Sequence, residues 1–142
     1  MRGEQVLQAL LRPTVMVRFI LTGLVGAIFE NAVLYALVEV GALSALLAAA
    51  VGKEVATLTV FFINDTWTFK EVTGTKAPFT WRLIRSHLVR ALGVIVSLLA
   101  LYTVLRYTDL YFIAANIVGI GVGFIVNYAL ENLVTWKTHK AD

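Results

Sequence analysis

Four long apolar stretches follow one another along the chain, at 19–38, 43–63, 88–105 and 110–133. Each is close to the ~20 residues that an α-helix needs to cross a hydrocarbon core about 30 Å thick. Only short polar segments separate the first stretch from the second and the third from the fourth, so each pair is predicted to form a helical hairpin. The pattern predicts an all-α membrane protein with four transmembrane helices.

The second half of the chain resembles the first. Residues 18–70 align without a gap with residues 85–137. The identical pairs include residues that apolar composition does not explain, namely Arg18/Arg85, Gly26/Gly93, Tyr35/Tyr102, Gly52/Gly119 and Lys70/Lys137. The sequence thus predicts a single membrane domain over 1–142, with two repeats joined by a connector at 71–84. Since each repeat crosses the membrane twice, the two should enter it from the same side as parallel repeats.

Composition and charge agree with this prediction and set an orientation. The 142 residues are 59% apolar and only 15% charged, with a mean hydropathy of +0.81. Apart from Arg106 and Lys53, every Lys and Arg lies in the termini, in the connector or where the spans meet them. Such residues mark cytoplasmic segments, so we expect a multi-pass protein of the cell membrane with both termini in the cytoplasm. The net charge of +3 then reflects membrane orientation, and we expect no nucleic-acid partner.

Two segments outside the spans are predicted to lie on the cytoplasmic surface. Residues 1–14 alternate as a short amphipathic helix that ends at Pro13. A second surface helix could begin at Phe79 and lead into the third span. The aromatic and basic residues of 65–87 form either an ordinary aromatic belt with orienting charges or a surface that turns Arg side chains toward lipid phosphates.

Charged residues inside the spans need an explanation, because each costs about 2.5–3.5 kcal/mol at a helix centre. At ~1.5 Å per residue, Glu30 and Lys53 both lie about 15 Å from the start of their own spans, so they are predicted to pair near the midplane. The pair is either a salt bridge that fixes the hairpin or a polar site used by a passing substrate or proton. Ser97 and Ile120 replace it in the second repeat, which favours the functional interpretation.

Small and amide residues follow one face of the fourth span. They permit either close helix packing with hydrogen bonds or a narrow polar groove. The predicted packing positions are Gly23, Gly26, Gly93, Gly119 and Gly123. The candidate intramembrane polar site comprises Glu30, Asn31, Lys53, Glu54, Asn116 and Asn127.

The sequence contains no motif typical of catalysis. It has no Cys, no Gly-rich phosphate loop and no Ser/His/Asp arrangement, and its two His residues lack metal-ligand spacing. We therefore expect no enzyme activity, no cofactor and no metal ion.

The ends of the second and fourth spans resemble the GtrA-like family. The motif reads Phe61-Phe-Ile-Asn-Asp-Thr-Trp-Thr-Phe-Lys70, with an echo at 127–137, and the resemblance extends over about 15–139. Val60 and Val134 depart from the family pattern, so the repeats should not be functionally equivalent. The residues of this interfacial signature are Asn64, Asp65, Trp67, Phe69, Glu131, Asn132 and Trp136.

The resemblance implies translocation of a polyprenyl-phosphate-linked sugar for polysaccharide or glycan assembly, beside a family-2-type membrane glycosyltransferase. The cations expected to bind the lipid phosphate are Arg18, Lys70, Arg82, Arg85 and Lys137. One alternative is a non-transporting anchor for the glycosyltransferase. Another is a small proton-coupled exporter, which a partner for Glu30 disfavours. Membrane lipids are the remaining partners, and we expect a homo-oligomer because four spans alone enclose little space.

Overall fold

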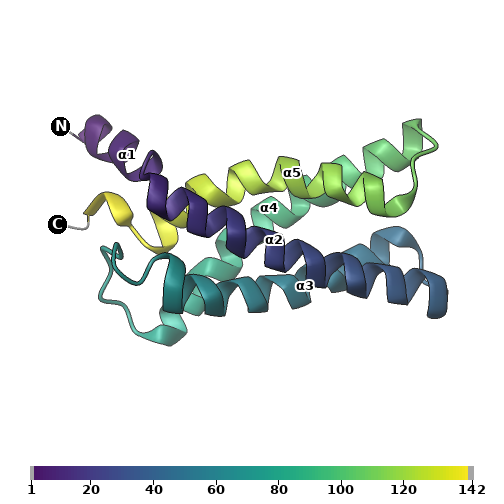
Figure 1. The fold of residues 1–142 in the computed structure, drawn as a ribbon, viewed down its shortest axis with the longest axis horizontal. Coiled ribbons are helices and arrows are strands. Elements are labelled where there is room, and N and C mark those ends of the chain that lie inside the picture. Colours follow the sequence, from purple (N-terminus) through teal and green to yellow (C-terminus); the bar gives the residue numbers. More distant parts are fainter. Residues whose placement is uncertain (1, 141–142) are drawn as a thin grey trace.

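The structure, a computed structural model, describes residues 2–140, and this part of the chain is helical without strands (Figure 1). The α-helices are α1 (Arg2–Leu10), α2 (Pro13–Tyr35), α3 (Ala45–Ile63), α4 (Phe79–Tyr107) and α5 (Phe112–Leu130). Three π-helical turns extend α2, α3 and α5: η1 (Ala36–Val40), η2 (Asn64–Thr68) and η3 (Glu131–Thr135). A 3₁₀ turn, η4 (Thr138–Lys140), follows.

Four helices are long and apolar enough to cross a membrane, at Pro13–Val40, Ala45–Thr68, Phe79–Tyr107 and Phe112–Lys140. The predicted all-α fold with four spans is confirmed. The helices extend beyond the apolar stretches because their polar ends stay helical. The predicted second surface helix is not separate, since Phe79 begins the 29-residue helix α4 without a break.

Local sequence determines several helix ends. Pro13 occupies the first turn of α2, where its missing N–H loses no hydrogen bond. Ser44 caps α3 by accepting a hydrogen bond from Leu47 N at 3.4 Å. Pro78 precedes α4, and its fixed backbone separates that helix from the connector.

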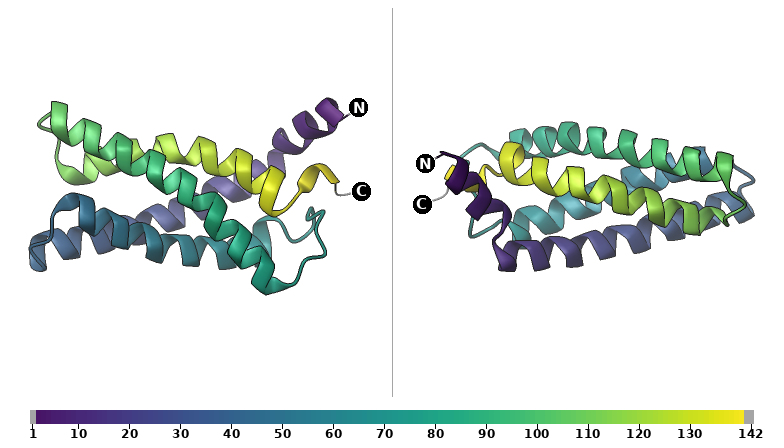
Figure 2. Two further views of the ribbon diagram at one scale, coloured as in Figure 1. Left: turned by 180° about the vertical axis from the view of Figure 1, so that it is seen from behind. Right: turned by 90° about the horizontal axis from the view of Figure 1, so that it is seen from above.

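The helices form two hairpins, α2–α3 and α4–α5, that point the same way. Both hairpin turns lie at one end of the molecule, which we call the turn end (Figure 1). Both termini and the connector lie at the other, which we call the terminal end. From behind, α4 starts beside the end of α3 and runs obliquely to pair with α5 (Figure 2). This arrangement fits two hairpins entering a membrane from one side, while the cytoplasmic location of the termini stays a prediction.

Two apolar clusters join the hairpins. At the terminal end the cluster contains Val15, Phe19, Phe61, Phe69 and Trp136. At the turn end it contains Leu34, Ala48, Ala49, Leu101 and Ala115. Most other large apolar side chains are exposed on the outside of the bundle, as expected for a surface that faces lipid.

Glycines allow the two helices of each hairpin to touch. A Cβ atom on Gly52 would lie 2.7 Å from the carbonyl oxygen of Glu30, and one on Gly119 would lie 2.6 Å from that of Ser97. These two contacts occupy corresponding positions of the aligned segments. The duplication stays a prediction, but the two hairpins share this packing contact.

A cavity between the hairpins as the candidate functional site

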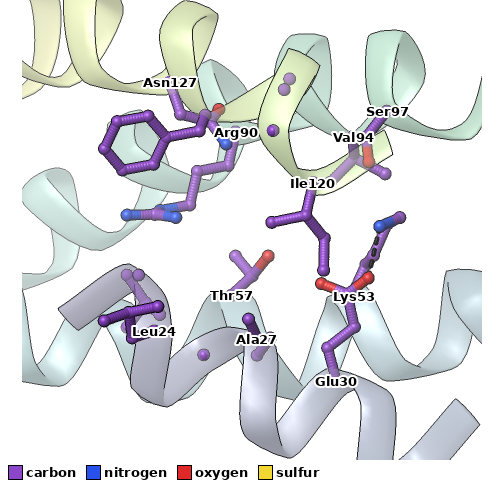
Figure 3. Close-up of a pocket in the computed structure, with 18 of the residues that line it drawn as sticks. Leu24, Ala27, Glu30, Lys53, Thr57, Arg90, Val94, Ser97, Ile120 and Asn127 are labelled. Carbon is purple, nitrogen blue, oxygen red and sulfur yellow. Dashed lines mark hydrogen bonds and ion pairs between the residues drawn. The ribbon is translucent and has the colours of Figure 1, made fainter. Parts of the chain in front are cut away.

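A cavity of about 310 Å³ lies between the two hairpins, where α2, α3, α4 and α5 all contribute side chains (Figure 3). Along the chain its lining residues fall between those of the two apolar clusters, so the cavity occupies the middle of the bundle. Most of the wall is apolar. The polar groups include Glu30 and Lys53 toward the turn end and Arg90 and Asn127 toward the terminal end.

Glu30 and Lys53 form the predicted ion pair, and both side chains are buried. Gly52 brings α3 against the backbone of α2, which places Lys53 within reach of the carboxylate. Asn116 of α5 joins the pair, because its Nδ2 donates to Glu30 Oε1 at 2.8 Å and its Oδ1 accepts from Lys53 Nζ at 3.2 Å. The same amide also donates to Asn31 Oδ1 at 3.2 Å.

This network connects the two hairpins, since Glu30, Asn31 and Lys53 belong to the first and Asn116 to the second. A paired and hydrogen-bonded charge avoids most of the penalty of an isolated ion in a low-dielectric interior. The sequence correctly predicted that Glu30 and Lys53 pair, whereas the use of this network by a substrate is a proposal.

A second buried ion pair, Arg90 with Glu131, was not predicted. Arg90 Nε lies 2.9 Å from Glu131 Oε1, and Ser86 Oγ donates to the same oxygen at 2.7 Å. All three side chains are buried. Arg90 had been counted among the orienting cations although it falls inside the apolar stretch 88–105, and that position was the signal that could have revealed it.

Two residues of the candidate polar site lie elsewhere than expected. Glu54 points away from the cavity: its side chain is 62% exposed and lies 2.9 Å from His87 Nε2 on the outside of the bundle. It follows Lys53 directly and therefore occupies a different face of α3. Asn127 lines the cavity near Arg90 instead of joining the Glu30 network, and its Oδ1 has no hydrogen-bond partner.

The candidate lipid-phosphate cations do not line the cavity. Arg82 forms a two-pronged contact with Asp65, at 2.7 Å through Nε and 3.1 Å through Nη2. Arg18 donates to the carbonyl oxygen of Trp67 at 3.2 Å and lies over its ring. Arg85 reaches only Thr75, at 3.5 Å.

The remaining two candidate cations close the aligned segments. Lys70 is exposed, and Lys137 is half-buried with a positive φ of 49°. The structure therefore does not bring the five cations into one site.

Most of the interfacial signature is internal. Phe69 and Trp136 are buried and stack at a centroid distance of 5.2 Å, and Asn64 is fully buried. Asn132 binds the last turn of the chain, where its Oδ1 accepts from Thr138 Oγ1 at 3.1 Å. The expectation of an aromatic belt over 65–87 is wrong for Phe69, because the ends of the two hairpins pack on each other there and Phe69 is buried against Trp136.

The packing glycines also act within the molecule. Gly119 and Gly123 face α4, Gly26 faces Val60 of α3, and Gly93 faces Asn127 of α5. Gly23 lies in the cavity wall, where an added Cβ atom would be 3.4 Å from the ring of Phe124. The small-residue stripe of α5 is thus occupied by α4 and is not available for contact between protomers.

Comparisons with known proteins agree with this architecture. The model of the GtrA/DPMS transmembrane domain family matches residues 18–136. A protein of Pyrococcus furiosus named dolichol-phosphate mannosyltransferase is 31% identical over 122 residues, which are 86% of this chain and 34% of that relative. The chain spans about a third of that relative's length. With four membrane-spanning helices and a family match over most of its length, this multi-pass membrane protein belongs to the GtrA/DPMS transmembrane domain family.

Proposed function

We propose that the protein moves a polyprenyl-phosphate-linked sugar across the cell membrane, with both of its termini in the cytoplasm. The observation that carries this proposal is the cavity between the hairpins at mid-depth of the bundle. A sugar headgroup cannot cross hydrocarbon without losing hydrogen bonds to water, and each uncompensated polar group costs several kcal/mol. A cavity in the middle of the membrane, with a few polar groups in a mostly apolar wall, lowers that barrier.

The cavity wall offers hydrogen-bonding groups suited to a sugar. Thr57 and Ser97 line it, and the hydroxyl of Ser97 has no hydrogen-bond partner. The Glu30–Lys53 pair adds a carboxylate and an ammonium at the turn end of the same space. A volume of about 310 Å³ is near the lower limit of small-molecule sites, which suits one headgroup with its lipid tail outside.

Reconstitution tests this proposal directly. Purified protein is placed in liposomes with a labelled polyprenyl-phosphate sugar, and a membrane-impermeant reagent reports how fast the label changes leaflet. Ala27→Phe places a large ring in the cavity wall and should abolish the movement. Ala91→Phe adds the same ring on an exposed face of α4 that does not line the cavity, and it should retain the rate.

The readings that contradict the proposal are equally clear. No movement by the folded wild-type protein rejects it, as does a rate that Ala27→Phe leaves unchanged.

A second function, that of an anchor for a glycosyltransferase, is favoured by one finding. The chain matches 34% of a relative that is named as a mannosyltransferase. In this alternative the catalytic step belongs to a partner enzyme, and the chain holds that partner or a second protomer at the membrane. Co-purification of a family-2-type glycosyltransferase with a protein that moves no lipid would support the anchor.

A further inference from the structure

Arg90 is a buried cation with unused hydrogen-bond donors. Its side chain is only 8% exposed, and its guanidinium points into the cavity (Figure 3). Within residues 2–140, Nη2 has no hydrogen-bond partner, and the contact of Nε with Glu131 is an ion pair by distance without hydrogen-bond geometry. Burying a guanidinium with unpaired donors lowers the free energy of unfolding. A ligand that accepts hydrogen bonds from these donors would offset this loss.

The neighbouring groups complete a site for an anion. Glu131 neutralises Arg90 from behind and is itself held by Ser86. Asn127 lines the same part of the cavity, and its Nδ2 is a neutral donor for an anion. At the position that corresponds to Arg90, the first hairpin has Gly23, which also lines the cavity. Among the residues that line the cavity, Arg90 is thus the one that carries a guanidinium.

The cavity is open to the hydrocarbon side of the bundle. Ile20 and Leu24 of α2 line it and are also 42% and 56% exposed. Gly121 of α5 also lines the cavity, and a Cβ atom added to it would have nothing within 4 Å. An acyl or isoprenoid chain could stay outside between α2 and α5 while its polar end enters.

We infer that Arg90 is the receptor for the phosphate group of an isoprenoid lipid, held inside the cavity with Asn127 beside it. This inference rests on the proposed function, which supplies the class of lipid. A guanidinium binds phosphate through the N–H donors of its planar fork, and Nη2 of Arg90 is a donor that no described residue uses. Two cations at the terminal end are less suited, because Arg82 is engaged by Asp65 and Arg18 by Trp67, and none of the five candidate cations there lines the cavity.

The test compares probes that separate the sources of phosphate. Binding to purified protein in detergent is measured for farnesyl phosphate, for the uncharged farnesol, for inorganic phosphate and for phosphatidylglycerol. Wild type should bind farnesyl phosphate more tightly than the other three. Equal binding of farnesol removes the role of the phosphate, equal binding of inorganic phosphate removes the role of the lipid, and equal binding of phosphatidylglycerol removes the preference for an isoprenoid; each outcome overturns the inference.

Variants then locate the phosphate. Arg90→Gln/Glu131→Gln removes both buried charges together and should weaken farnesyl phosphate binding about tenfold or more. Glu131→Gln alone retains Arg90, so it should bind farnesyl phosphate more tightly than the double variant does. Lys76→Gln removes one exposed positive charge of the connector and should leave the affinity unchanged.

Unchanged affinity in the double variant, at equal folded amount, overturns the inference. So does folded Glu131→Gln that binds as weakly as the double variant. If the double variant does not fold, Arg90→Lys decides, since it keeps the charge but loses the planar fork: reduced affinity supports the inference and unchanged affinity overturns it.

The two proposals fail separately. If Arg90-dependent binding is found but liposomes show no movement of lipid, the binding site stands and the transport proposal fails. If Arg90→Gln/Glu131→Gln moves the lipid at the wild-type rate, transport stands and the role of Arg90 is rejected.

Discussion

The two hairpins share their packing and differ in their charges. In both, a glycine of the later helix rests on a backbone carbonyl of the earlier one, Gly52 on Glu30 and Gly119 on Ser97. The buried ion pairs do not correspond. The first hairpin holds Glu30 with Lys53, where the second has Ser97 and Ile120.

The second hairpin holds Arg90 with Glu131, where the first has Gly23 and Asn64. Each hairpin thus carries a buried pair at positions where the other is uncharged. At ~1.5 Å per residue, Gly23 lies about 10 Å from Glu30 along α2, so the two pairs mark different depths of one cavity. The comparison teaches that glycine contacts define the hairpin, while the polar chemistry is specific to each half.

The largest difference is expected in chemical labelling, because the terminal end and the turn end should lie on opposite sides of the membrane. In this Cys-free chain, Thr75→Cys in the connector and Thr108→Cys at the turn end each provide a single labelling site. Impermeant maleimide applied to whole cells should label the second and not the first, because the basic connector resists translocation. Labelling of Thr75→Cys alone would reverse the orientation, and labelling of both or neither would contradict it.

Breaking one buried pair should cost about 3–5 kcal/mol in free energy of unfolding, because a lone charge stays buried. Lys53→Met tests the first hairpin and Arg90→Met the second, both measured by denaturant unfolding in detergent micelles. Adding Glu30→Gln or Glu131→Gln, respectively, should restore most of the loss. If a double variant is no more stable than the single variant, the unpaired carboxylate is not what lowers the free energy of unfolding.

Replacing the contact glycine by alanine should lower stability to a similar extent in the two hairpins. Gly52→Ala and Gly119→Ala each force a methyl group against a backbone oxygen and should cost about 1–3 kcal/mol. Gly121→Ala is the matched control, since nothing lies within 4 Å of its Cβ position, and it should change stability by less than about 0.5 kcal/mol. If one of the two buried glycines tolerates Ala, the hairpins do not share this contact energetically.

The smallest effect on stability is expected at the terminal ends of the hairpins, where the two hairpins have different polar contacts. Asp65 holds Arg82, whereas Asn132 at the corresponding position holds Thr138. Asp65→Asn should therefore cost about 1 kcal/mol in a partly buried, two-pronged ion pair. A double-mutant cycle with Arg82→Gln measures the coupling, and additive losses would mean that the contact adds nothing.

The sequence predicted what depends on apolar length, charge and spacing. It gave the four spans, the pairing of Glu30 with Lys53 and the family. It missed what depends on the rotation and crossing of helices. Glu54 was grouped with Lys53 because of its depth, yet it faces outward to His87.

Arg90 illustrates the same limit, but here a residue expected at the membrane surface is buried. Near the start of a span, an Arg is usually an orientation signal, and only the oblique course of α4 beside η3 shows that Glu131 neutralises it within the bundle. The burial of Phe69 and Trp136 was likewise unpredictable, because it requires the ends of two distant hairpins to meet.

The stack of Phe69 on Trp136 also provides an intrinsic optical reporter. Of the three Trp residues, Trp67 and Trp81 are exposed, whereas Trp136 is 1% exposed with no hydrogen-bond partner for its indole nitrogen. With Trp67 and Trp81 replaced by Phe, emission from the remaining indole would follow the junction at which the two hairpins meet. A red shift on adding a lipid would then register their separation in real time, without any attached dye.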